Sequence, residues 1–194
     1  MDLPIYDLII SDKVNDDAEV SFVALVDKPA IKRDFFAFTD VVRFAIQSED
    51  EHIVTGPLMI PDQLIYRNSE KLGEHYVKFT ADTIKQIAIK FIKKGYQCNV
   101  NLMHDAAMQV EGCTMFESFI SDTKRGVKCM EQFADLPDGT WFGSFYIENP
   151  EVWQLVKQGQ VRGFSVEGLF DYEKPISKEE QTLRELGKIL NSFQ

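Results

Sequence analysis

The chain has 194 residues, 44% of them hydrophobic and 12% aromatic, so it has enough apolar material for a buried core and is not a disordered chain. Its 31 acidic and 21 basic residues leave a net charge of −10, the wrong sign for a partner of nucleic acid or of an anionic membrane surface. The absence of a bilayer-spanning apolar run or a signal peptide, together with three widely spaced cysteines, predicts a soluble protein of a reducing cytosol.

Short apolar runs separated by polar or Pro-containing links predict a mostly β protein. In chain order the expected strands are residues 5–10, 20–26, 35–38, 53–60, 75–79, 98–104, 114–120, 141–147 and 161–170. Pro137 and the Asp138-Gly139 pair predict a tight turn, with the flanking strands forming a hairpin around it.

Two helices interrupt the strands. The first has Thr80 as its N-cap, apolar residues at i, i+3, i+4, i+7 and i+8 from Ile84, and Gly95 at its end. The second opens with Asn149-Pro150, a capping residue followed by proline at the first helical position, and ends at Gly159.

The chain is expected to divide into one domain over residues 1–175 and a short appendage over residues 176–194. The appendage follows the breaker Pro175 and carries a capping box and an apolar stripe. These features predict an amphipathic helix, which either packs on the domain or connects it to something else.

Two polar residues are placed where catalytic groups often lie. His104 ends an apolar strand directly before a loop, so a rigid scaffold would present its ring to solvent. Ser165 lies between Gly163 and Gly168 on a strand, where glycine allows another backbone to approach. Each also has a structural alternative, as a hydrogen-bonded histidine and as a polar strand residue.

Other chemistries find little support in the sequence. No Cys-x-x-Cys or His-x-x-x-His spacing predicts a metal site, and no phosphate-binding loop or dinucleotide fingerprint predicts a cofactor. A thiol dyad of Cys113 with His104 lacks any marker of an activated cysteine. We therefore expect neither a metal ion nor a cofactor.

The order of several motifs resembles the prohead (capsid maturation) serine proteases of tailed bacteriophages. The resemblance rests on Asn101-Leu-Met-His-Asp105, Val110-Glu-Gly112, Glu117-Ser-Phe-Ile120 and the run from Trp153 to Gly168, and upstream on Ala24 to Ala30 and Thr55 to Pro61. It covers roughly residues 20 to 172.

The resemblance implies the fold of herpesvirus assemblin: an α+β, mostly antiparallel protein with a closed β-barrel ringed by helices. It also implies a serine endopeptidase with Ser165 as the nucleophile and His104 as the base that takes the hydroxyl proton.

The third catalytic residue, which would hold the imidazole tautomer, is expected to be Glu117. A hairpin across Gly112 would bring its carboxylate beside His104. Asp105 and Glu167 are the rivals, although each was expected to face away from the residue it adjoins, because neighbours in a strand point to opposite faces.

Four further polar residues are weaker candidates for the site. His52 and His75 could also serve as the third member, although surface positions are expected for both. Ser144 could face the site but is expected to pack. Arg162 is a conditional oxyanion donor, with backbone N–H groups as the alternative.

The function implied by the resemblance is cleavage of scaffold and major capsid protein segments, through an acyl-enzyme on Ser165, inside the prohead in the cytoplasm of an infected bacterium. A homo-oligomer is compatible with this function. The alternatives are a catalytically inactive relative that serves as an internal scaffold or docking component of the phage head, and an unrelated β-barrel binding module in which His104 and Ser165 lie far apart.

Overall fold

The computed structural model describes residues 3–10, 17–27, 44–105 and 107–173. The strand expected at residues 35–38 and the helix expected over residues 176–194 fall outside these ranges. Within them the protein is α+β, mostly strands with two α-helices, as the sequence predicts. No helix in the described ranges is long and apolar enough to cross a membrane.

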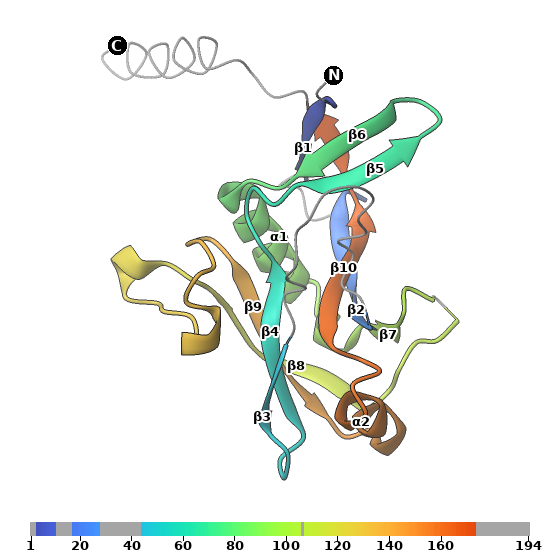
Figure 1. Ribbon diagram of the computed structural model, residues 1–194, viewed down its shortest axis with the longest axis vertical. Helices are drawn as coiled ribbons and strands as arrows, with labels where there is room; N and C mark the ends of the chain where they lie inside the picture. The colour runs from blue at the N-terminus through green and yellow to red at the C-terminus, as the bar shows by residue number, and fades with distance from the viewer. Residues whose placement is uncertain (1–2, 11–16, 28–43, 106, 174–194) are drawn as a thin grey trace.

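The strands form three sheets (Figure 1). The first has the order β11-β1-β6-β5, the second β10-β2-β7 and the third β3-β4-β9-β8. The strands are β1 (Ile5–Ile9), β2 (Glu19–Val26), β3 (Ala45–Ser48), β4 (Ile53–Met59), β5 (Ile65–Ser69), β6 (Gly73–Lys78), β7 (Val100–Leu102), β8 (Cys113–Ile120), β9 (Trp141–Ile147), β10 (Gly163–Leu169) and β11 (Asp171–Glu173). Most pairs are antiparallel, while β1–β6 and β2–β7 are parallel.

Among the described residues, the three sheets are not joined into the closed barrel that the resemblance implied. The third sheet approaches the second where β4 faces β10, and there the contact is made by side chains. A Cβ at Gly56 of β4 would lie 3.3 Å from the ring of Phe164. No ladder of backbone hydrogen bonds links β4 to β10, so β10 is an edge strand of its sheet among the described residues.

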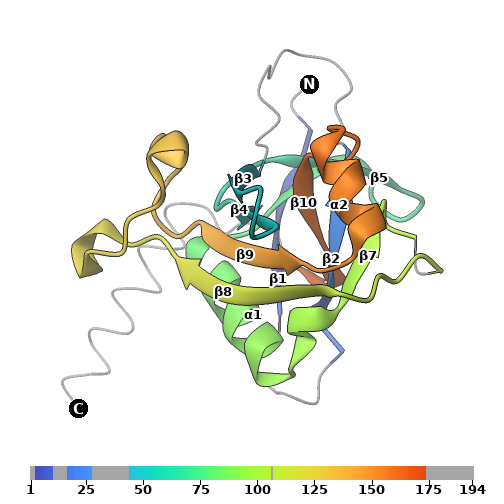
Figure 2. The ribbon, with the colours of Figure 1, turned by 90° about the horizontal axis from the view of Figure 1, so that it is seen from below.

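Both predicted helices are present, with the predicted caps. Helix α1 (Ala81–Lys93) begins after Thr80, whose side chain accepts a hydrogen bond from the Thr83 N–H. Helix α2 (Pro150–Lys157) begins after Asn149, whose side chain accepts from two backbone N–H groups. In the view of Figure 2, α1 lies on one side of the β8–β9 pair and α2 on the other, near β10.

The apolar face of α1 joins the main core. Its Phe91 meets the ring of Trp141 edge-on at 5.5 Å, and both side chains are almost completely buried. The same core receives Val23 and Leu25 from β2, the central strand of the second sheet. Burial of this face therefore fixes the position of β2, and with it the positions of β10 and β7, which pair with β2.

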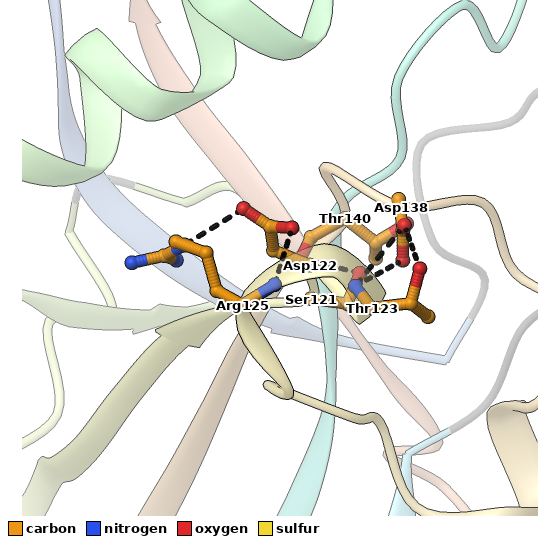
Figure 3. A network of polar contacts seen from close by, with 6 residues as sticks. All are labelled: Ser121, Asp122, Thr123, Arg125, Asp138 and Thr140. Carbon is orange, nitrogen blue, oxygen red and sulfur yellow. Dashed lines mark hydrogen bonds and ion pairs between the residues drawn. The ribbon is translucent and has the colours of Figure 1, made fainter.

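The predicted hairpin at residues 114–147 is present as β8 paired with β9, but its connection is longer than a tight turn. Residues 121–140 carry two short 3₁₀ helices, at Thr123–Arg125 and Glu131–Phe133. Figure 3 shows the polar contacts that hold the base of this connection. Asp138 accepts hydrogen bonds from the N–H and hydroxyl of Thr123, and Asp122 accepts from the Arg125 guanidinium at 2.7 Å.

Candidate active site

Ser165 is the third residue of β10 and is only 4% exposed. It pairs with Ala24 of β2, and Ala24 in turn pairs with Asn101 of β7. The three residues thus form one row across the second sheet, about 10 Å long at the usual strand spacing. Their side chains share the face opposite Phe164, which joins the core. The small Ala24 leaves room between Ser165 and Asn101.

His104 reaches this face because the chain bends sharply after β7. The strand expected over residues 98–104 contains only Val100–Leu102, and Met103 and His104 both have left-handed backbone angles, with φ of 55° and 62°. Such angles are uncommon outside glycine and occur at functional turns. Met103 is held in place by its N–H, which donates to the Leu25 carbonyl at 3.0 Å.

A carboxylate lies directly against the His104 ring. The Nδ1 atom of His104 is 3.0 Å from Oε1 of Glu167, and the Asn101 side-chain amide donates to the same oxygen at 2.7 Å. Glu167 follows Ser165 by two residues in β10, so strand alternation places both on one face. The expectation that Glu167 would face away from the site is therefore wrong, because the residue that alternates with Ser165 is Val166.

Ser165, His104 and Glu167 line one cleft of about 770 Å³. One wall comes from the end of β4 and the residues after it, from Pro57 to Ile60, and another from β10 itself. No hydrogen bond joins Ser165 to His104 in the structure. In enzymes without substrate such contacts are often long, and they tighten when the substrate binds.

Glu117 lies elsewhere. The expected hairpin across Gly112 does not form, because β7 pairs with β2 whereas β8 pairs with β9 in the third sheet. Glu117 is opposite Ser144, beside an irregularity in the register, and its side chain is exposed and does not line the cleft. The strand register on which the Glu117 assignment rested is therefore wrong.

The other candidates for the third role also have separate partners. Asp105 is exposed and accepts a hydrogen bond from the Ala107 N–H at 2.9 Å. His52 is stacked on Trp153, with ring centroids 4.6 Å apart. His75 is fully buried between Tyr6 and Tyr172, which contradicts its expected surface position.

The side chains of Ser144 and Arg162 make hydrogen bonds outside the cleft. Ser144 packs as expected, accepting a hydrogen bond from the Thr55 hydroxyl at 2.8 Å in the buried part of the third sheet. The Arg162 guanidinium donates to the carbonyl of Gly159, which follows the end of α2, and Arg162 does not line the cleft. Backbone N–H groups are therefore the better candidates for oxyanion donors.

The Cys113 thiol is not activated for nucleophilic chemistry. Burial, reinforced by the charge of Glu148, raises the pKa of the Cys113 thiol to about 12, so it is not a thiolate near neutral pH. In the described part of the chain, no group of three or more His, Cys, Asp or Glu side chains is arranged to hold a metal ion.

The arrangement of His104 suits general base chemistry. With Glu167 accepting from Nδ1–H, the imidazole is held in the tautomer whose Nε2 carries a free lone pair. A lone pair in the same cleft as a serine hydroxyl can accept its proton during attack on a carbonyl. Asn101 donates to the same Glu167 oxygen that His104 contacts, so two donors fix the position of the carboxylate.

Comparisons with known proteins agree with this chemistry. Residues 40–173 match the model of the family described as "Putative phage serine protease XkdF", and this segment contains Ser165, His104 and Glu167. The chain is similar to the phage-like element PBSX protein XkdF of Bacillus subtilis strain 168, at 26% identity over 83% of the chain. It is also similar to the uncharacterized protein YqbD of the same strain, at 24% identity over 91% of the chain.

The chain spans a little over half the length of these two relatives, 57% of XkdF and 53% of YqbD. No solved structure matches the chain.

Proposed function

The chain belongs to the family described as "Putative phage serine protease XkdF", and we propose that it is a serine endopeptidase with Ser165 as nucleophile, His104 as general base and Glu167 as the residue that orients His104. The observation that carries this proposal is the 3.0 Å contact between His104 and Glu167 in the cleft that contains Ser165. Glu167 takes the role that the sequence had suggested for Glu117.

The proposed reaction has two halves. In the first, Ser165 Oγ attacks the scissile carbonyl while its proton passes to His104 Nε2, and the resulting imidazolium is stabilised by Glu167. His104 then protonates the leaving amine, the C–N bond breaks, and an acyl-enzyme forms on Ser165. In the second half, water gives a proton to His104 and its oxygen attacks the ester, which releases the acid and restores the serine.

We propose that the substrates are segments of the scaffold and major capsid proteins, cut inside the prohead during maturation. The family description and the similarity to a phage-element protein support a phage role. The catalytically inactive relative, acting as a scaffold or docking component, is the competing proposal, and the missing hydrogen bond between Ser165 and His104 is the observation that favours it.

Purified protein incubated with an unstructured test protein such as reduced casein separates the two proposals. The protease reading predicts cleavage by the wild type and none by Ser165→Ala or His104→Ala, with a double variant no worse than either single one, because these residues act as a unit. Ser48→Ala, at the end of β3 and outside the cleft, is the matched serine control and should cleave normally. A wild type that leaves the test protein intact would support the inactive reading.

A further inference from the structure

The cleft continues well beyond Ser165. Its lining includes every residue from Phe164 to Phe170 and then Tyr172 of β11, a stretch of about 25 Å in extended conformation. Consecutive residues of a strand line a groove together when the groove runs along the edge of that strand. The cleft is therefore shaped for a chain that lies beside β10.

Among the described residues, β10 forms its ladder with β2 alone, and no strand pairs with its other edge. One backbone hydrogen bond lies just before β10, from the Phe44 N–H to the Arg162 carbonyl at 3.0 Å. An unpaired strand edge binds extended peptides through main-chain hydrogen bonds, and the side-chain pockets then supply specificity.

The side chains that line the cleft are mostly apolar, among them Ile65 of β5, Phe79 and Phe170. Arg67 of β5 is the only lysine or arginine among the described lining residues. The Arg67 guanidinium donates to the Tyr66 carbonyl, and no described carboxylate pairs with it. Figure 1 shows β5, the strand that carries Arg67, crossing beyond the end of β10 at which β11 begins, away from α2.

We propose that the cleft binds its substrate as an extended, largely apolar segment that carries an acidic side chain for Arg67, several residues from the scissile bond. The acidic position follows from charge complementarity, because a guanidinium beside apolar walls selects a carboxylate and rejects an ammonium group. The inference rests on the proposed function, since Ser165 must mark the scissile bond.

The test measures binding without hydrolysis. A library of synthetic 10-residue peptides, with neutral residues throughout and one scanned position bearing Glu, Gln or Lys, is titrated against the Ser165→Ala protein by fluorescence anisotropy. We expect Glu to bind best at one restricted position. Arg67→Glu should weaken binding of that peptide about 5- to 10-fold and favour Lys instead.

Lys71→Glu is the matched control, because it makes the same change of charge on the exposed turn between β5 and β6, outside the cleft. It should leave the binding preference unchanged. Equal binding of Glu and Gln peptides, equal effects of the two substitutions, or no binding of any peptide would overturn the inference. A preference for Glu in a protein whose wild type cuts nothing would instead overturn the proposed function alone.

Discussion

Oε1 of Glu167 in β10 is 3.0 Å from Nδ1 of His104 in the turn after β7, although the two residues are 63 positions apart in the chain. The contact forms because β10 and β7 flank the same central strand and because two left-handed residues turn the chain back after β7. It places a carboxylate where the proposed mechanism needs one.

Glu167→Gln should lower kcat by about 10² to 10⁴-fold with little loss of stability, because an amide can hold either tautomer of His104 and cannot balance an imidazolium. Glu117→Gln and Asp105→Asn should stay near wild type in the same peptidase assay. If Glu117→Gln cripples the enzyme while Glu167→Gln does not, the orienting role assigned to Glu167 is incorrect.

Asn101→Leu should lower activity without lowering the stability of the fold. Its amide N–H positions Glu167, so we expect kcat to fall about 10- to 100-fold with a smaller change in KM. Its side-chain Oδ1 is buried and has no hydrogen-bond partner in the part of the chain that the structure describes, and removing such an atom should leave the free energy of unfolding unchanged or raise it by about 1 kcal/mol.

Urea unfolding and steady-state kinetics on the same Asn101→Leu sample measure both quantities, with the ¹H–¹⁵N NMR spectrum of the His104 ring as a direct report on its tautomer. A parallel loss of stability and activity, with an unaltered His104 tautomer, would mean that Asn101 serves packing alone.

Gly168→Ala should destabilise the fold strongly, by more than about 3 kcal/mol. A Cβ at Gly168 would lie 2.0 Å from the carbonyl oxygen of Glu19, inside the register irregularity between β10 and β2, so the backbone would have to move. The exposed neighbour Leu169→Ala is the control and should change the free energy of unfolding by less than about 1 kcal/mol. Comparable unfolding midpoints for the two variants would refute the close approach of β10 to β2.

Glu19 should make stability depend on pH in the acid range. Burial acts to raise the pKa of Glu19, but hydrogen bonds from Lys94 and Tyr96, with the charges of Lys94 and Lys90, outweigh it and hold the pKa below 4.5. A lowered pKa in the folded state gives stability that is present above the ordinary pKa and is lost as the pH falls through the folded value.

The free energy of unfolding should therefore differ between wild type and Glu19→Gln by about 1–3 kcal/mol near neutral pH, with the wild type more stable. The difference should shrink as the pH falls below 4.5. Denaturant titrations at several pH values check this, and a difference that grows toward acid pH would contradict the sign.

The helices could be predicted because their signals are local. Thr80 and Asn149 cap the two helices through hydrogen bonds to N–H groups two or three residues away, and the apolar period is visible in one window of sequence. The strands were mostly found as well, except for the short or polar β3, β5 and β11.

The prediction of strand pairing is wrong where the paired strands are far apart in the sequence. The sequence suggested that β7 would pair with the next strand, but β7 instead adds to β2 in parallel, more than 70 residues back in the chain. No turn motif in the sequence indicates such a pairing. The left-handed bend at Met103 and His104 is not indicated by the sequence either. Glu167 could have been found, because its spacing of two from Ser165 already puts both on one face.

The most direct test of the central claim is covalent labelling of Ser165. A fluorophosphonate probe should label the wild type, and peptide mapping by mass spectrometry should place the adduct on Ser165. Labelling should be absent in Ser165→Ala and slowed in both His104→Ala and Glu167→Gln, because each removes part of the activation of the hydroxyl. No adduct on Ser165 in folded wild-type protein, under conditions that label trypsin completely, would contradict the assignment of a serine nucleophile.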